Sequence, residues 1–184
     1  VFSNLYACPS CGFSISELEP RLFSFNNPSG ACPGCDGLGV KHYFDPEKIV
    51  VDDNLSLANG AIRGWDARNA YYFSLLKGLA KYYGINIELP YKRLTKKHKQ
   101  AILFGSNGEA IEFVYHNDRG GKIKRLHPFE GIIPNIERRY RDTESNSVRD
   151  DLSKYISMQA CQDCQGTRLN EAARHVLVDK TNLP

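Results

Sequence analysis

Six cysteines in three Cys-x-x-Cys pairs constrain this chain more than any other feature of its sequence. The pairs are Cys8/Cys11, Cys32/Cys35 and Cys161/Cys164. Together they contain every cysteine of the 184 residues. Two thiolates on either side of a two-residue turn can grip one tetrahedral metal ion, so each pair supplies half of a four-sulfur zinc site. Three pairs cannot all be matched with one another, so one pair must be spare, use other ligands or await another segment.

Two pairings are compatible with the sequence. The segments Ala31–Gly37 and Ala160–Gly166 share the pattern Ala-Cys-x-x-Cys-x-Gly, which favours one site made by Cys32/Cys35 and Cys161/Cys164. The alternative joins Cys8/Cys11 to Cys32/Cys35 in a compact Cys-x2-Cys-x20-Cys-x2-Cys module. Loop-closure entropy grows slowly with length, so the longer separation does not exclude the first pairing.

A disulfide framework, buried free thiols and a redox enzyme are the other interpretations of six cysteines. The sequence has no secretory signal and no apolar run of membrane length, which favours a reducing cytoplasm and no membrane contact. No thioredoxin-like strand and helix surround the pairs, which argues against electron transfer. We therefore expect a cytoplasmic protein whose cysteines hold zinc.

Positive charge is concentrated in the middle of the chain. The formal net charge is only +3, with 41% hydrophobic and 11% aromatic residues. The segment from Tyr91 to Arg141, however, contains twelve basic residues and only five acidic ones. The basic residues are Lys92, Arg93, Lys96, Lys97, Lys99, Arg119, Lys122, Lys124, Arg125, Arg138, Arg139 and Arg141. They are candidate contacts to the phosphates of double-stranded DNA, and a solvated surface without a partner is the alternative.

Hydrophobic periodicity predicts an α+β fold. We expect one helix from Asp66, as its cap, to about Tyr83 before Gly84, and a second over 96–104 capped by Thr95. Alternation over 111–115 predicts a hairpin with its turn at 117–121, and Ile123 with Leu126 can continue the returning strand. Two helices should follow, over 135–141 and from a cap at Thr143 to 156, and a strand over 174–178.

These elements predict a small zinc-knuckle module interrupted by a mixed helix and β-hairpin insertion. The expected boundaries are 1–42 for the first knuckle part, 43–157 for the insertion and 158–184 for the returning knuckle part. The aromatic residues of the basic region, Tyr91, Tyr115, Phe129 and Tyr140, are expected mainly in the core, as is Trp65. No pair of carboxylates or histidines has a catalytic spacing, so we predict no catalytic residue. The chain starts without Met and stops without a terminating signal, so we expect a piece of a longer protein.

Several long motifs resemble one known family. They are Tyr6–Gly12, Glu17–Cys32, Cys35–Gly39, Asn59–Trp65, His127–Gly131, Arg138–Arg141 and Cys161–Leu169. In this order they resemble the UvrA family of damage sensors in bacterial nucleotide excision repair. The resemblance covers essentially the whole chain and corresponds to the first half of such a protein, from after the UvrB-binding insertion, through the insertion domain, into the signature domain.

The resemblance implies part of a dimeric ABC-type ATPase that recognises damaged DNA, loads UvrB for the UvrABC excision nuclease, and belongs to the SOS response. It also implies that Cys32/Cys35 pair with Cys161/Cys164, while Cys8/Cys11 pair with ligands upstream. Neither a phosphate-binding Gly-x-x-x-x-Gly-Lys-Ser/Thr loop nor a Leu-Ser-Gly-Gly signature occurs between Val1 and Pro184. We therefore expect ATP only in the full-length protein and no enzyme activity from this segment. A structural or protein-interaction insertion without DNA contact is the alternative function.

Overall fold

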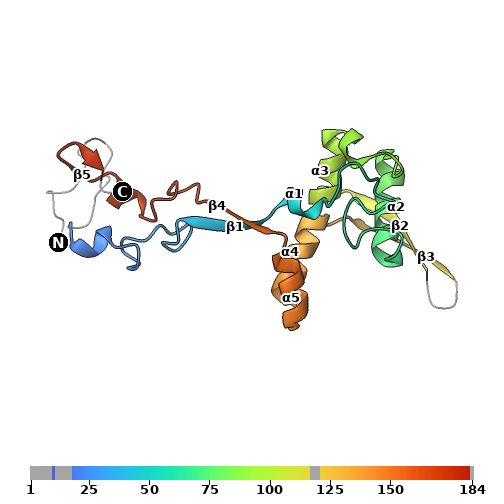
Figure 1. Ribbon diagram of the computed structural model, residues 1–184, viewed down its shortest axis with the longest axis horizontal. Helices are drawn as coiled ribbons and strands as arrows, with labels where there is room; N and C mark the ends of the chain where they lie inside the picture. Colours follow the sequence, from blue (N-terminus) through green and yellow to red (C-terminus); the bar gives the residue numbers. More distant parts are fainter. Residues whose placement is uncertain (1–9, 11–17, 117–120, 183–184) are drawn as a thin grey trace. The chain divides into compact units, whose positions relative to one another are not determined.

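The computed structural model describes residue 10, residues 18–116 and residues 121–182 (Figure 1). Its helices and short strands make an α+β chain, as the sequence predicts. The chain divides into two compact units. We refer to residues 1–43 with 158–184 as the cysteine unit and to residues 44–157 as the inserted unit. Within the described ranges, no helix combines the length and the apolar character needed to cross a membrane.

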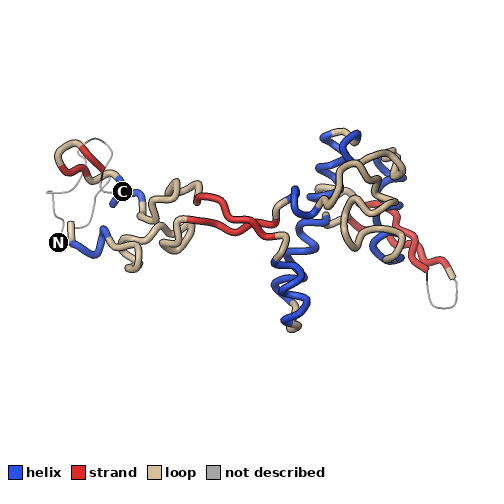
Figure 2. Tube along the Cα trace, viewed as in Figure 1, coloured by secondary structure: helices blue, strands red, loops and turns tan. Residues whose placement is uncertain are grey.

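The cysteine unit is built from short elements joined by turns. The elements, two of which continue past its boundary, are η2 (Pro20–Phe23), β1 (Val40–Phe44), β4 (Ile156–Ala160), α6 (Glu171–Arg174), β5 (Leu177–Val178) and β6 (Thr181–Asn182). β1 pairs with β4, and β5 pairs with β6 (Figure 2). Apart from the cysteines, its buried cluster contains only Leu22, Leu169 and Ala173 among the described residues. Apolar burial this small contributes little to the stability of the described part of the unit.

The inserted unit combines helices with one β-hairpin. Its elements are α1 (Pro46–Ile49), α2 (Ala70–Tyr83), η3 (Tyr91–Arg93), α3 (Lys96–Phe104), β2 (Ala110–His116), β3 (Lys122–Pro128), α4 (Ile132–Asp142) and α5 (Asn146–Ser153). One hydrophobic core joins them, with Ile102, Phe113 and Ile132 fully buried. The unit therefore has a larger apolar core than the described part of the cysteine unit.

The predicted hairpin is confirmed, with β2 antiparallel to β3 along the full length of both strands. Ile111 and Phe113 are buried while Glu112 between them is exposed, because successive side chains of a strand point to opposite faces. Most of β3 is exposed. β2 is thus the strand that is anchored in the core, whereas β3 presents its cationic side chains to solvent. The predicted turn residues 117–120 lie outside the described residues.

α2 begins later than the sequence predicts. Asn69, and not Asp66, caps the helix by accepting a backbone hydrogen bond from its first turn. The buried Asp66 carboxylate instead accepts hydrogen bonds from the backbone and the guanidinium of Arg68. The Asp66 side chain is therefore bonded within the turn before the helix and does not cap α2. The predicted end is confirmed, because Gly84 follows the last turn in the left-handed conformation with φ 67°.

Local capping residues decide the other helix boundaries. α3 and its cap, Thr95, are as predicted. α4 begins before the predicted Asn135, and α5 is capped by Ser145 rather than by Thr143. Thr143 ends α4 and its N–H bonds back to that helix, while its Oγ1 accepts a hydrogen bond from the N–H of Ser145, the residue that caps α5. α5 also ends earlier than predicted, because Ile156 already belongs to β4.

The last predicted strand is shorter than expected. Only Leu177 and Val178 of the predicted 174–178 form a strand, namely β5. Arg174 instead ends α6, whose cap Asn170 accepts a hydrogen bond from the backbone of Ala173. A side-chain cap four residues upstream was the signal that this helix precedes the strand.

Seven aromatic rings form a closed ring of neighbours in the inserted unit. Neighbouring ring centroids lie between 4.3 Å and 6.3 Å apart. In order around the ring, the residues are Trp65, Phe129, Phe113, His127, Tyr115, Tyr71 and Tyr72. Trp65 is only 2% exposed, which confirms its packing role. Phe129 and Tyr91 are buried as predicted, and Tyr115 and Tyr140 are half-buried.

Gly78 provides a test of the contact between α2 and β2. A Cβ atom there would lie 2.5 Å from the Phe113 ring and 3.2 Å from the Glu112 carbonyl oxygen. Helix propensity alone favours Gly78→Ala by about 0.5–1 kcal/mol. We expect the steric conflict to dominate, so that the substitution lowers the free energy of unfolding by about 1–3 kcal/mol in chemical denaturation. Lys81→Ala, on an exposed part of the same helix, is the control, and a more stable Gly78→Ala variant would contradict the packing.

Candidate metal centre and nucleic-acid surface

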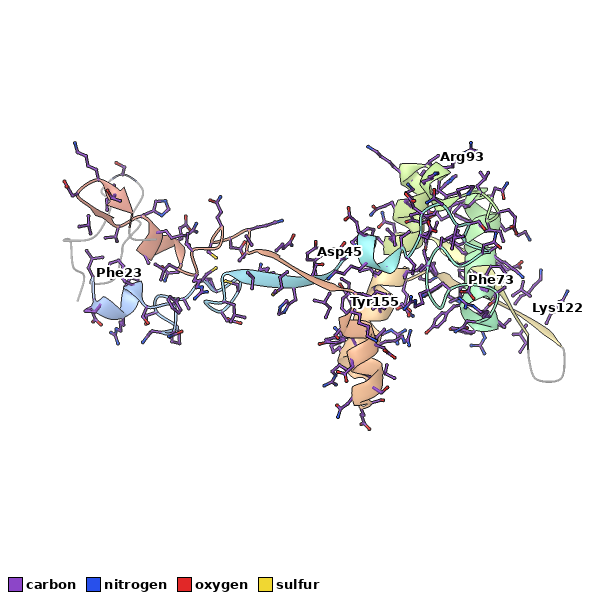
Figure 3. All side chains as sticks on the ribbon, viewed as in Figure 1. Phe23, Asp45, Phe73, Arg93, Lys122 and Tyr155 are labelled. Carbon is purple, nitrogen blue, oxygen red and sulfur yellow. The ribbon has the colours of Figure 1, made fainter. Side chains whose placement is uncertain are left out.

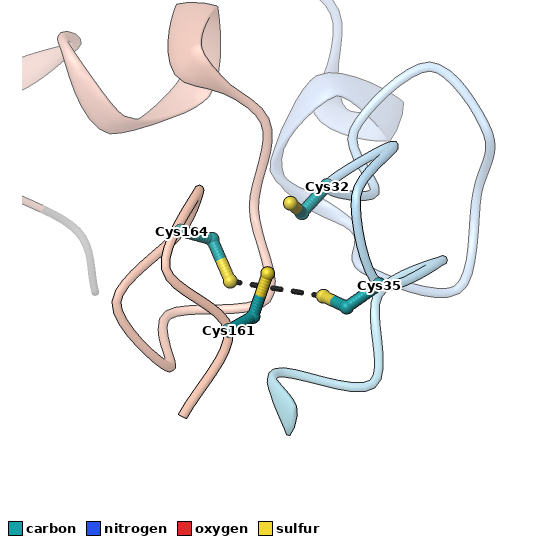
Figure 4. A group of neighbouring side chains, drawn as sticks. All are labelled: Cys32, Cys35, Cys161 and Cys164. Atoms are coloured by element: carbon teal, nitrogen blue, oxygen red, sulfur yellow. Dashed lines mark hydrogen bonds between the residues drawn. The ribbon is translucent and has the colours of Figure 1, made fainter. Parts of the chain in front are cut away.

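Four thiols from two distant chain segments converge in the cysteine unit, as Figure 4 shows. They belong to Cys32, Cys35, Cys161 and Cys164, and all four are buried. Their sulfur atoms lie within 4.8 Å of one another, and Cys35 Sγ is 3.7 Å from Cys164 Sγ. The structure thus brings together the two pairs with like sequences.

The third predicted pair is Cys8/Cys11. Cys8 and Cys11 lie outside the described residues. Among the described residues, the four clustered cysteines are the one group that could hold a metal ion.

Each clustered pair lies in a tight turn completed by left-handed backbone. After the first pair, Asp36 and Gly37 have φ values of 49° and 76°, and after the second, Gln165 and Gly166 have 53° and 87°. These four residues occupy the two positions, x and Gly, that follow the second cysteine in each copy of the shared motif. Glycine adopts this conformation without steric cost, which explains its place in both turns. Similar sequences therefore produce similar knuckles.

Backbone N–H groups point at the sulfur atoms. The Gly39 N–H donates to Cys35 Sγ at 3.2 Å. Burial raises the pKa of the Cys35 thiol, and this N–H opposes the rise. Burial also disfavours ionisation of Cys164, yet the N–H groups of Arg168 and Gly166 bring its pKa below the ordinary value. Both knuckles therefore offer donors that stabilise thiolate, the form of cysteine that binds metal.

The sulfur geometry fits a tetrahedral metal and does not fit a disulfide. All four cysteines are free, and the 3.7 Å separation of Cys35 Sγ and Cys164 Sγ exceeds the roughly 2.05 Å of an S–S bond. A tetrahedral centre with metal–sulfur bonds of about 2.3 Å has sulfur atoms roughly 3.8 Å apart. Four thiolates also fill all positions of such a centre, so it can link chain segments but has no open position for catalysis.

An ion pair joins β1, which follows the first knuckle, to the second knuckle beside the sulfurs. Lys41 Nζ lies 2.9 Å from Asp163 Oδ2, and Asp163 Oδ2 lies 3.9 Å from Cys161 Sγ. The pair raises the pKa of Lys41 and lowers the pKa of Asp163. Gly34 in the first knuckle leaves room for this carboxylate, because a Cβ atom at Gly34 would lie 1.8 Å from Asp163 Oδ2. Sequence reasoning missed this pair, and its only signal was a charged residue inside the second knuckle.

The predicted DNA-contacting residues lie on separate elements of the inserted unit. Five belong to η3 and α3, three to β3 and three to α4. Figure 3 shows Arg93 beside α3 and Lys122 on the hairpin, well apart from each other. Arg119 lies outside the described residues.

Carboxylates neutralise three of these cations. Lys124 pairs with Glu112 at 3.2 Å, Arg138 with Glu130 at 2.9 Å and Arg141 with Asp142 at 3.3 Å. Lys92 donates instead to the Asn54 amide, and Lys99 lies over the Tyr91 ring. Six further cations make no ion pair within the described residues, namely Arg93, Lys96, Lys97, Lys122, Arg125 and Arg139. Like these six, Lys92 and Lys99 have no carboxylate partner among the described residues, so all eight are stronger candidates for phosphate contacts than the three paired cations.

The described residues combine a cluster of four cysteines that could hold a metal ion with an α+β unit that carries surface cations without ion pairs. Residues 45–154 match the family model described as the UvrA DNA-binding domain. This match covers more than half of the chain, and the chain therefore belongs to the UvrA family.

Similar proteins agree with this assignment. The chain is 59% identical over 184 residues to the UvrABC system protein A of Vibrio cholerae and of Pseudomonas aeruginosa, and 56% identical to that of Escherichia coli K12. Each alignment covers 100% of this chain but only 19–20% of the relative, so the chain spans about a fifth of their length. The crystal structure of UvrA2 from Deinococcus radiodurans shares the fold, with a TM-score of 0.64 and 22% identity over 89% of this chain and 21% of that one.

The ion pair beside the sulfurs gives a prediction for metal affinity. Lys41→Met leaves Asp163 as an unpaired negative charge next to four thiolates, so we expect Zn²⁺ affinity to fall about 10-fold. The double variant Lys41→Met/Asp163→Asn removes both charges and should recover most of the affinity. Competition with a chromophoric chelator measures both values. Equal losses in the single and double variants would contradict an electrostatic role for the pair.

Proposed function

We propose that this chain is the zinc-scaffolded, DNA-contacting part of a UvrA protein that acts in nucleotide excision repair. The match of residues 45–154 to a DNA-binding domain model carries the proposal, because it covers nearly all of the inserted unit. Uncompensated cations such as Lys96, Lys97 and Arg125 on that unit support it. We propose further that the inserted unit is the insertion domain and that the cysteine unit is part of the signature domain.

Zinc is the proposed metal of the four-cysteine centre. Thiolate ligands select soft or borderline metals, and a closed tetrahedral four-sulfur site is typical of structural zinc. Cys32, Cys35, Cys161 and Cys164 would hold it, while Cys8 and Cys11 would serve a site completed from elsewhere. The role of the metal is to fasten the two chain segments that enter and leave the inserted unit. It supplies no step of a reaction.

The phosphates of damaged double-stranded DNA are the proposed ligand of the cations. Contacts between basic side chains and phosphates are independent of base sequence, which suits a sensor that must work in any sequence context. In the full-length protein we propose a dimer that binds ATP, contacts UvrB and reads the deformation of the duplex. These activities require segments beyond the fifth of the relatives' length that this chain spans.

Salt dependence of DNA binding tests the proposal. The logarithm of affinity falls with the logarithm of salt concentration, with a slope of about −0.9 for each phosphate that is neutralised. We expect Lys96→Gln/Lys97→Gln and Lys122→Gln/Arg125→Gln each to flatten the slope for an undamaged duplex by about one to two, measured by fluorescence anisotropy.

Lys77→Gln/Lys81→Gln is the matched control, because it removes two positive charges from α2, outside the predicted set. Equal flattening in the control would mean that only net charge matters. Duplex binding that is absent or insensitive to salt, together with capture of a protein partner, would favour the structural or protein-interaction insertion instead.

A further inference from the structure

A surface hollow of about 330 Å³ lies in the inserted unit, away from the hairpin and from α3. Its walls come from the loop before α2, the first turn of α2, α4 and the end of α5. Tyr155, labelled in Figure 3, belongs to its lining. Two of the motifs named above, Asn59–Trp65 and Arg138–Arg141, contribute residues to its lining, but its walls are brought together only by folding.

Three cations and one carboxylate line the hollow. The cations are Arg63, Arg139 and Lys154, and the carboxylate is Asp151, which pairs with Lys154 at 2.6 Å. Arg63 and Arg139 form no ion pair within the described residues. Only Arg139 belongs to the cations that the sequence nominates. The hollow therefore carries an excess of positive charge that the protein itself leaves uncompensated.

Two effects show that these charges act on one another. The hydrogen bond from Lys154 to Asp151 raises the pKa of Lys154, while repulsion from Arg63 lowers that pKa. The bond to Lys154 lowers the pKa of Asp151, and attraction to Arg63 adds to it. Arg63, which lines the same hollow, thus contributes to the electrostatics of both groups. An anion in the hollow would relieve the repulsion between Arg63 and Lys154.

The hollow is preorganised by packing. The Arg139 guanidinium lies over the Tyr72 ring at 5.7 Å, and Tyr72 in turn lies 4.3 Å from Trp65. The buried Trp65 and Leu152 give an apolar lining, against which charges interact more strongly than in open water. Asn69 and Tyr72, at the N-terminus of α2, also line the hollow, so the positive end of the α2 dipole lies at the edge of the hollow.

We propose that this hollow is a phosphate clamp, in which Arg63, Arg139 and Lys154 hold one backbone phosphate group of nucleic acid. The inference rests on the proposed DNA-binding function and gives it one fixed site. A concave site with a stacked guanidinium and a helix N-terminus suits a compact tetrahedral anion. An apolar ligand would leave this charge arrangement unused.

Trp65 supplies a direct readout, because it is the only tryptophan and lines the hollow. The unaltered chain is titrated with a short undamaged duplex, following anisotropy of the labelled DNA and fluorescence of Trp65. Arg63→Gln/Lys154→Gln is the test variant, since both side chains are exposed and their loss leaves the core intact. Lys77→Gln/Lys81→Gln is the control of equal charge.

We expect duplex binding to change Trp65 fluorescence over the same concentration range as the anisotropy. In Arg63→Gln/Lys154→Gln the fluorescence change should disappear and the salt slope should flatten by about one, the loss of one phosphate contact. The control should keep the fluorescence change. The near-ultraviolet circular dichroism of the test variant should match that of the unaltered chain.

Other outcomes distinguish a failure of the proposed clamp from a failure of the proposed DNA-binding function. Duplex binding by anisotropy with an unchanged slope and fluorescence response in the test variant would overturn the clamp and leave the proposed function intact. No duplex binding by the unaltered chain would remove the proposed function. A Trp65 response to inorganic phosphate without duplex binding would overturn the nucleic-acid clamp, because the ligand would then be a free anion.

Discussion

The convergence of four thiols is the interaction on which the cysteine unit depends. Cys32 and Cys35 are separated from Cys161 and Cys164 by more than a hundred residues, and the unit buries few other apolar side chains among those described. Bringing two such distant segments together costs chain entropy, and small apolar clusters offset little of it. A metal–thiolate centre can supply roughly 10 kcal/mol or more of folding free energy, enough to close the loop. Backbone donors such as the Gly39 N–H prepare the sulfurs for that role.

The inserted unit is stabilised in a different way. Its stability comes from one apolar core and a closed ring of aromatic side chains, so that its surface is free to carry charge. Some of the cations form local ion pairs, for example Arg138 with Glu130. The rest are left without carboxylate partners on α3, on β3 and around one hollow. A unit that folds on its own core can hold such cations in fixed positions, and fixed cations are what phosphate recognition requires.

The parts predictable from the sequence are those fixed by neighbours in the chain. Thr95 with α3, Gly84 after α2 and the alternation of β2 are local signals, and each was predicted correctly. Repetition of one motif indicated which cysteines converge. The start of α2 was wrong because Asp66 bonds Arg68 instead of the helix. The pair of Lys41 with Asp163 and the cations around the hollow could not be predicted, because residues far apart in sequence meet there only after folding.

Zinc content in two matched double variants tests the central claim most directly. Elemental analysis after exhaustive dialysis would compare Cys161→Ser/Cys164→Ser with Cys8→Ser/Cys11→Ser, each against the unaltered chain. If the four clustered thiols hold the metal, the first variant loses the tightly bound zinc and the cysteine unit unfolds, whereas the second retains it. Retention of zinc by Cys161→Ser/Cys164→Ser and its loss from Cys8→Ser/Cys11→Ser would contradict the account, since the metal would then join the first two pairs.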